Sequence, residues 1–101
     1  MTIEVLYFGS CPSYKPTVER IRTLLREENL DGEIRQIEIT DSISAKEQRF
    51  LGSPTVQVNG LDIERSALTD ERFGLCCRTY GGSGVPSVDM IRSALRNARR
   101  D

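Results

Sequence analysis

Three cysteines are the groups in this sequence best suited to chemistry, because it contains no histidine. The lack of an imidazole excludes Ser–His and Cys–His nucleophile pairs and histidine metal ligands. Cys11 lies near the N-terminus, whereas Cys76 and Cys77 are adjacent to each other late in the chain. An odd number of cysteines cannot form a closed disulfide framework. The sequence therefore points to thiol redox chemistry, to metal binding by thiolates, or to ordinary buried cysteines.

Cys11 follows a strand-like segment and precedes a helical pattern. Residues 3–8 are apolar at nearly every position, which suits a central strand buried on both faces. Apolar residues recur at helical spacing from Thr17 to about Asn29. A thiol at a helix N-terminus meets unpaired N–H groups and the positive end of the helix dipole, and both favour the nucleophilic thiolate. Pro16 leaves two alternatives: a helix that is kinked there, or one that begins later and weakens this effect at Cys11.

The rest of the chain carries further strand and helix patterns. We expect a strand at 33–39, a short helix at 44–51, a hairpin of strands at 55–58 and from 61, one helical turn at 69–73, and a final helix from 87. Ser44 and Glu47 have the spacing of a capping box, and Asn59-Gly60 is a two-residue hairpin signal. The order β-α-β-α-β-β-α combines a parallel unit with an antiparallel hairpin, so the sheet must be mixed.

Length, charge and hydropathy limit the class of protein. The 101 residues fit a single domain, residues 1–101. The net charge of −1 argues against a nucleic-acid partner. No apolar run approaches the roughly 20 residues that span a bilayer, and the first residues lack the pattern of a secretory signal. We therefore expect no membrane partner and a cytoplasmic location, where thiols are kept reduced.

Two short motifs fall at matching places in this element order. Cys11-Pro12-Ser13-Tyr14 lies between the end of the first strand and the start of the first helix, and Ser53-Pro54-Thr55 immediately precedes the hairpin. With these motifs the chain resembles the thioredoxin-fold superfamily over essentially its whole length. The resemblance implies an α/β thioredoxin-like fold with a mixed four-stranded sheet. It also implies a cis-proline at Pro54 that packs against the reactive thiol of Cys11, and a Ser53 backbone that pairs with an extended thiol substrate.

A narrower resemblance rests on the strings around Cys11, around Pro54 and at 74–78. These are similar to small bacterial thioredoxin-like proteins labelled with alkylmercury lyase or thiol-redox functions. The chain departs from the wider family at Tyr14, where thioredoxins and glutaredoxins have a second cysteine or a serine. Cys11 therefore lacks the usual resolving thiol, and this leaves open whether the chain is an enzyme.

The function implied is a monothiol thiol–disulfide oxidoreductase without a cofactor, in which Cys11 attacks a disulfide of a protein or of a glutathione-like molecule. Cys76 or Cys77 is a candidate distal resolving cysteine, because glycines at 81, 82 and 84 give this segment flexibility. Ser53, Pro54, Tyr14 and Arg78 are the expected substrate contacts, and Arg49 joins Arg78 as a candidate ligand of an anionic substrate. Packing is the simpler role for Tyr14, and ion pairing is the simpler role for both arginines.

Two other functions remain open from the sequence. Thiolates of Cys11, Cys76 and Cys77 are suited to soft metal ions such as Hg(II), Cu(I) or Zn(II), which would agree with a role in metal resistance. Alternatively, the chain is a thioredoxin-fold binding module that performs no catalysis. Replacing the three thiols separates these cases, because the binding module would not need them.

Overall fold

Strands and helices alternate along the chain in this computed structural model, which describes residues 1–9 and 11–99. The elements are, in order, β1 (Thr2–Tyr7), α1 (Tyr14–Glu27), β2 (Glu33–Glu38), α2 (Ser42–Glu47), β3 (Thr55–Val58), β4 (Leu61–Asp62), the 3-10 helix η1 (Arg65–Thr69) and α3 (Val88–Arg99). Apart from η1, this is the β-α-β-α-β-β-α order that the sequence predicts.

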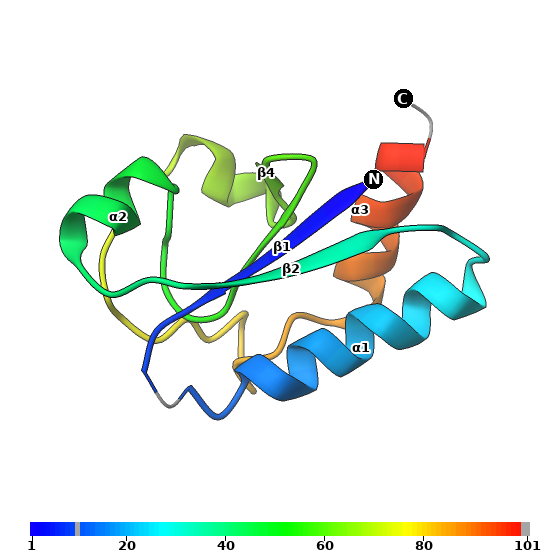
Figure 1. The fold of residues 1–101 in the computed structure, drawn as a ribbon, viewed down its shortest axis with the longest axis horizontal. Helices are drawn as coiled ribbons and strands as arrows, with labels where there is room; N and C mark the ends of the chain where they lie inside the picture. The colour runs from blue at the N-terminus through cyan, green and yellow to red at the C-terminus, as the bar shows by residue number, and fades with distance from the viewer. Residues whose placement is uncertain (10, 100–101) are drawn as a thin grey trace.

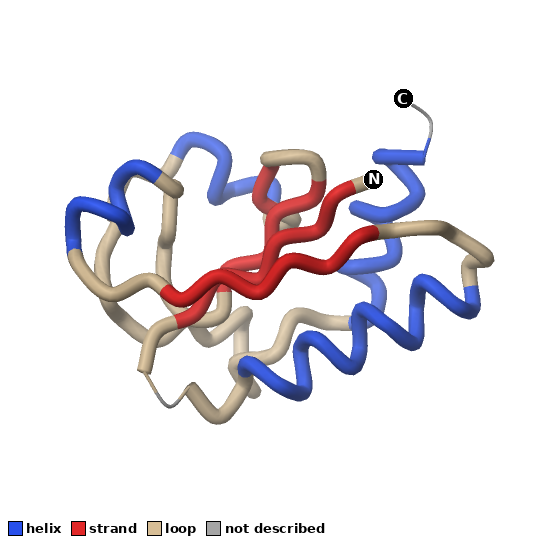
Figure 2. Tube along the Cα trace, viewed as in Figure 1, coloured by secondary structure: helices blue, strands red, loops and turns tan. Residues whose placement is uncertain are grey.

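The four strands form one mixed sheet in the order β2-β1-β3-β4 (Figure 2). The central strand β1 is parallel to β2 and antiparallel to β3, and β3 is antiparallel to β4. Asn59 and Gly60 connect β3 to β4 with φ angles of 51° and 85°, the left-handed conformation that a tight hairpin turn requires. The prediction of a mixed four-stranded sheet is confirmed.

Helices cover both faces of the sheet. Figure 1 shows α1 below the sheet and α2 at the opposite end of the molecule from α3. The larger apolar cluster joins α1 and α3 to β1 and β3, and its buried members are Ile3, Val5, Val18, Ile21, Leu24, Leu25, Val56, Val58, Ile91 and Leu95. A smaller cluster lies on the other face beside α2, and its buried members are Leu6, Ile39, Ala45 and Phe50. Side chains of β1 and β3 therefore alternate between an α1 face and an α2 face.

Helix α1 begins earlier than its apolar pattern suggests but later than Cys11. Ser13 is its N-cap residue and Tyr14 its first residue, so Pro16 lies within the first turn. The N–H groups of a first turn have no acceptor inside the helix, so a proline there removes no helical hydrogen bond. Of the two alternatives left open by Pro16, the structure has the later start.

Two local expectations are corrected. Helix α2 is capped by Asp41 and not by Ser44, because the Asp41 carboxylate accepts a hydrogen bond from the Ser44 N–H at 2.7 Å. The helical turn after the hairpin is η1 at residues 65–69 and not 69–73, and Ala67 is its buried residue. Neither error moves a strand or changes the topology.

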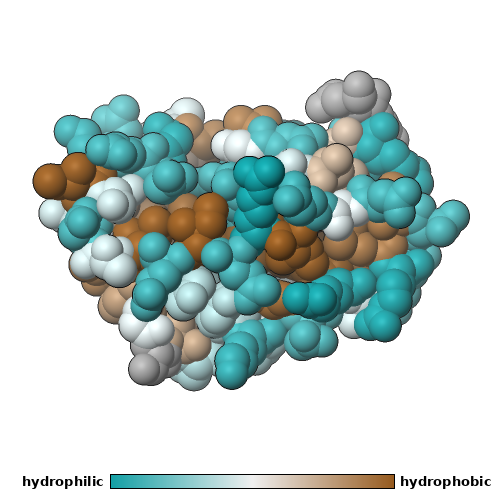
Figure 3. Space-filling model, viewed as in Figure 1, coloured by the Kyte–Doolittle hydropathy of each residue, from teal (hydrophilic) through white to brown (hydrophobic). Residues whose placement is uncertain are grey.

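The edge strand β2 carries mostly exposed side chains, including Glu33, Arg35 and Glu38. Figure 3 shows that apolar patches on this side of the molecule are separated by hydrophilic side chains. Charged side chains on an edge strand discourage pairing with a second sheet. Across residues 1–9 and 11–99, no helix is both long enough and apolar enough to cross a membrane.

Candidate functional site

Cys11 lies in the turn that connects β1 to α1, and its side chain is half-buried. The Cys11 carbonyl accepts a hydrogen bond from the Tyr14 N–H at 3.4 Å. The Ser13 carbonyl accepts from both the backbone N–H and the hydroxyl of Thr17, at 3.1 and 2.7 Å. The thiol is therefore neither enclosed in the core nor at the N-cap itself. It precedes the capping residue, where the field of the helix is weaker.

The Ser53–Pro54 element lies at the same end of the central strands as the Cys11 turn. Leu6 of β1 is paired with Thr55 of β3, so the residues after Leu6 run beside the residues before Thr55. The Phe8 N–H donates to Ser53 Oγ at 3.4 Å, and this bond joins the base of the Cys11 turn to the element. Ser53 and Pro54 are buried, and the peptide bond between them is cis, as the resemblance implies.

The chain itself pairs with the backbone of Ser53. The Ser53 N–H donates to the Cys76 carbonyl at 2.7 Å, and the Ser53 carbonyl accepts from the Arg78 N–H at 3.0 Å. These bonds form a parallel bridge between Ser53 and Cys77. We call residues 76–78 the strap. The expectation that the Ser53 backbone is free to pair with a substrate is thus corrected, because the strap uses both of its backbone groups.

Arg78 anchors the strap through a buried ion pair. Its side chain is 8% exposed, and its guanidinium donates to both carboxylate oxygens of Asp62 at 2.8 and 2.9 Å. It also donates to Glu64 at 2.8 Å and to Thr55 Oγ1 at 3.3 Å, and it lies 4.4 Å from the centre of the Tyr80 ring. Burial disfavours the charged guanidinium, but the hydrogen bonds and charges of Asp62 and Glu64 outweigh it, and the pKa of Arg78 is raised. Arg78 is therefore not available to bind an anionic substrate.

The segment after the strap returns to the Cys11 turn. The Tyr80 hydroxyl donates to the Pro54 carbonyl at 2.6 Å, and burial raises the pKa of this phenol. Farther along, Gly84 has a φ of +84°, and a Cβ on it would lie only 2.6 Å from Ser13 Oγ. The same Cβ would lie 3.6 Å from the Arg78 carbonyl oxygen. The Cys11 turn, the Ser53–Pro54 element and the strap are therefore neighbours in one site.

Cys76 and Cys77 are both exposed, and all three cysteines are free thiols. Cys76 Sγ lies 3.7 Å from the Leu51 carbonyl oxygen, and the residue lines a cavity of about 370 Å³ together with Ala67. Over the described part of the chain, no group of three or more Cys, His, Asp or Glu side chains is placed to hold a metal ion. The structure therefore does not bring Cys11, Cys76 and Cys77 together as the soft-metal site considered from the sequence.

Tyr14 has a packing role. Its ring stacks on that of Tyr7, with centroids 3.8 Å apart and planes 11° from parallel, and its hydroxyl donates to Gln36 Oε1. Burial and the neighbouring Tyr7 raise the pKa of the Tyr14 phenol. These contacts hold the start of α1 against β1 and β2, and they leave no free hydroxyl directed at Cys11.

Arg49 also stabilises a loop and is not a free cation beside the thiol. Its guanidinium donates to the carbonyl oxygens of Leu68 and Asp70 at 3.0 and 3.3 Å, and it lies 5.0 Å from the centre of the Phe73 ring. For both arginines, the packed and paired role is the one that the structure shows.

Sequence reasoning missed Asp62 and Tyr80, the two residues that fix the position of the strap. Asp62 reads as an ordinary strand residue, and Tyr80 lies in a segment without periodicity. Their partners, Arg78 and Pro54, are distant in the sequence, so no local spacing signals either contact. The one available signal was the position of Tyr80 two residues after Arg78, a spacing that places both side chains on one side of an extended segment.

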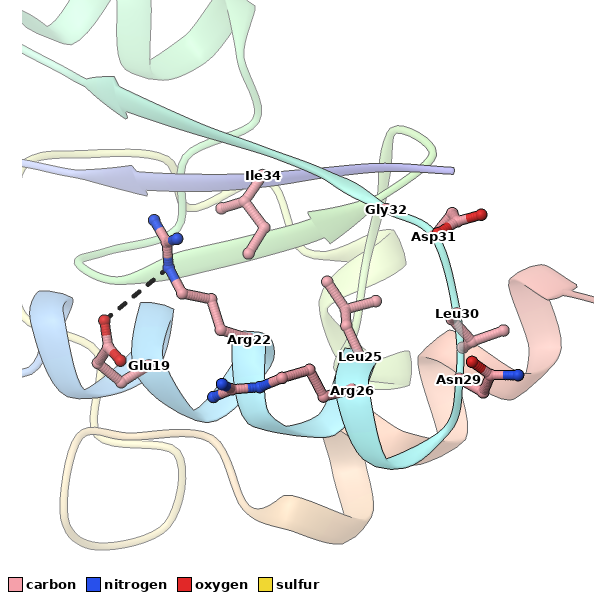
Figure 4. Close-up of a pocket in the computed structure, with 9 residues that line it drawn as sticks. All are labelled: Glu19, Arg22, Leu25, Arg26, Asn29, Leu30, Asp31, Gly32 and Ile34. Carbon is pink, nitrogen blue, oxygen red and sulfur yellow. Dashed lines mark ion pairs between the residues drawn. The ribbon is translucent and has the colours of Figure 1, made fainter.

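A cavity of about 780 Å³ lies away from this site, between the C-terminal half of α1 and the start of β2 (Figure 4). Its polar lining includes Glu19 and Arg22, which form an ion pair at 3.8 Å, and Arg26. No cysteine lines it. Because Cys11 precedes the opposite end of α1, this cavity does not belong to the candidate site.

No protein-family model, curated protein or solved structure matches this chain.

Proposed function

We propose that this chain is a thioredoxin-fold thiol–disulfide oxidoreductase of monothiol type, with Cys11 as its nucleophile. The proposal is supported by the mixed sheet in the order β2-β1-β3-β4 and by a half-buried thiol in the turn between β1 and α1. The observation that carries it is the bond from the Phe8 N–H to Ser53 Oγ, which joins the Cys11 turn to the Ser53–Pro54 element. A thiol beside the first turn of a helix is favoured as a nucleophile over one in a loop without such neighbours.

The proposed reaction begins when the Cys11 thiolate attacks one sulfur of a substrate disulfide. A mixed disulfide forms on Cys11, and the other substrate sulfur leaves as a thiolate that takes up a proton. A second thiol then resolves the mixed disulfide. A small-molecule thiol attacks the substrate sulfur, so that a new disulfide leaves and the Cys11 thiolate is restored, whereas a protein thiol attacks the Cys11 sulfur, forms a protein disulfide and releases the bound half of the substrate. Because Tyr14 stands at the position of the usual second cysteine, the second thiol comes from a small molecule such as glutathione or from Cys76 or Cys77.

The proposal is tested by the rate at which the protein reduces a glutathionylated peptide with glutathione as the reductant. We expect Cys11→Ser to lower this rate to the uncatalysed background. Cys76→Ser is the matched control. Because glutathione is supplied here as the second thiol, the reaction does not require Cys76, which is exposed and lines a separate cavity, and this variant is expected to retain more than half of the rate. A Cys11→Ser protein with the wild-type rate would show that the proposal is wrong.

A further inference from the structure

The two neighbouring thiols of the strap belong to opposite faces of the sheet. Cys77 is the residue bridged to Ser53, and Cys76 and Arg78 flank it. A Cβ placed on Gly52 would lie 3.3 Å from Cys76 Sγ and 3.1 Å from Arg78 Cβ, so both flanking side chains lie on the same side. Successive side chains in an extended strand alternate between faces. The side chain of Cys77 therefore points to the other face.

Contacts of β3 identify the face that Cys77 shares. Arg78 donates to Thr55 Oγ1, which places Arg78 on the face of Thr55. Val56, which follows Thr55 in β3, packs in the apolar cluster that α1 covers. The Gln57 side-chain amide donates a hydrogen bond to the Gln48 carbonyl at the end of α2. Thr55 and Gln57 thus belong to the α2 face. Cys77 consequently lies on the α1 face, and the Cys11 turn leads from β1 into the helix that covers this face.

The residues next to the two thiols come close to each other in space. Ser13 Oγ and the Arg78 carbonyl oxygen lie 2.6 and 3.6 Å from one point, the position that a Cβ would take on Gly84. Ser13 is two residues from Cys11, and Arg78 is next to Cys77. Cys11 and Cys77 are therefore presented from adjacent segments on one face, while Cys76 lines the cavity on the other.

We infer that Cys77, and not Cys76, is the resolving cysteine of Cys11 and that the strap holds it beside the Ser53–Pro54 element. This inference rests on the proposed function. Once Cys11 carries the half-substrate RS, the Cys77 thiolate attacks Cys11 Sγ, a Cys11–Cys77 disulfide forms, and RS⁻ leaves and takes up a proton. The two protein thiols have then supplied two electrons to the substrate disulfide. Two molecules of an external thiol, such as glutathione, reduce the protein disulfide again.

A single-turnover experiment tests the assignment. Reduced wild-type, Cys76→Ser and Cys77→Ser proteins are each mixed with one equivalent of oxidised glutathione, trapped with N-ethylmaleimide and mapped by non-reducing peptide mass spectrometry. We expect a Cys11–Cys77 disulfide in the wild type and in Cys76→Ser. In Cys77→Ser we expect a glutathione adduct to persist on Cys11. Because both substituted residues are exposed, circular dichroism is expected to show the same fold in all three proteins.

The other outcomes separate this inference from the proposed function. A Cys11–Cys76 disulfide, a Cys76–Cys77 disulfide, or a glutathione adduct on Cys11 that persists equally in the wild type and in Cys77→Ser would overturn the role of Cys77. A Cys11–Cys76 disulfide or a persistent adduct on Cys11 would still show that Cys11 is a nucleophile. If Cys11 forms neither an adduct nor a disulfide in any of the three proteins, both the inference and the proposed function are wrong.

Discussion

At the scale of single residues, the arrangement of the site depends most on Arg78. Its guanidinium links the strap to the hairpin through Asp62, whose side chain is only 7% exposed. Removing one partner of a buried pair leaves the other charge without compensation in a poorly solvated place. Arg78 therefore stabilises both the fold and the position of Cys77.

We predict that Arg78→Ala lowers the free energy of unfolding by about 3–5 kcal/mol, because the Asp62 carboxylate is left buried and unpaired. Urea denaturation followed by circular dichroism measures this change. Arg72→Ala is the matched control: Arg72 also forms an ion pair with an aspartate, but its side chain is 90% exposed, and its removal is expected to change stability very little. Equal urea midpoints for the two variants would contradict the structural role of Arg78.

A second prediction at this scale concerns the glycine that packs against the Cys11 turn. Gly84→Ala is expected to lower the free energy of unfolding by about 1–3 kcal/mol, because a residue with a side chain is strained at positive φ and its Cβ would collide with Ser13. Disulfide exchange at Cys11 is expected to slow as well, since a displacement of Ser13 moves the start of the helix that follows Cys11. Gly82→Ala is the control, because a Cβ there meets no atom within 4 Å. The close contact is refuted if both variants match the wild type in urea denaturation and in exchange rate.

At the scale of elements, helix α2 depends on its cap. Backbone hydrogen bonding from Ser44 holds the pKa of Asp41 below its ordinary value of 3.8. A carboxyl group whose native pKa is lowered stabilises the folded state above its ordinary pKa, and this contribution is lost as the pH falls through the native value. The charge of Asp41 thus stabilises α2 at neutral pH but not in strong acid.

We predict that Asp41→Ala lowers the urea midpoint at neutral pH more than Asp41→Asn does. The asparagine amide oxygen can accept the same hydrogen bond from the Ser44 N–H, whereas alanine cannot. The difference between the wild type and Asp41→Asn is expected to shrink as the pH falls below 3.8, where the wild-type carboxylate becomes protonated. A difference that stays constant from neutral pH into strong acid would show that the charge of Asp41 contributes nothing.

Elements with a local signature could be predicted from the sequence, and elements with a tertiary cause could not. The hairpin was predictable, because Asn59-Gly60 specifies its turn by itself. The start of α1 was not, because the apolar pattern begins at Thr17, while the first turn is held by the stacking of Tyr14 on Tyr7. That contact joins a helix to a strand and leaves no trace in the spacing of residues.

At the scale of the whole molecule, the candidate site joins three segments that are far apart in the sequence. Two of them, the Cys11 turn and the Ser53–Pro54 element, could be predicted to meet. The turn follows the end of β1, the element precedes the start of β3, and these two strand ends are neighbours because β1 and β3 are antiparallel. The position of the strap could not be predicted, since its sequence has no hydrophobic periodicity and it is not part of any of the four strands. Its position comes from its bonds to Ser53 and from the buried pair of Arg78 with Asp62. The position of the third segment thus depends on an ion pair and on backbone hydrogen bonds between residues that are distant in the sequence, and hydrophobic patterning does not reveal either of them.

The central claim is that Cys11 is the reactive thiol, and the order in which the three cysteines are alkylated tests it most directly. The reduced protein is treated at neutral pH with a limiting amount of iodoacetamide, and the modified residues are quantified by peptide mass spectrometry. If exposure alone set the rate of alkylation, the exposed Cys76 and Cys77 would be modified before the half-buried Cys11. We predict the reverse order, with Cys11 modified first. Modification of Cys76 and Cys77 first, with Cys11 last, would contradict this account.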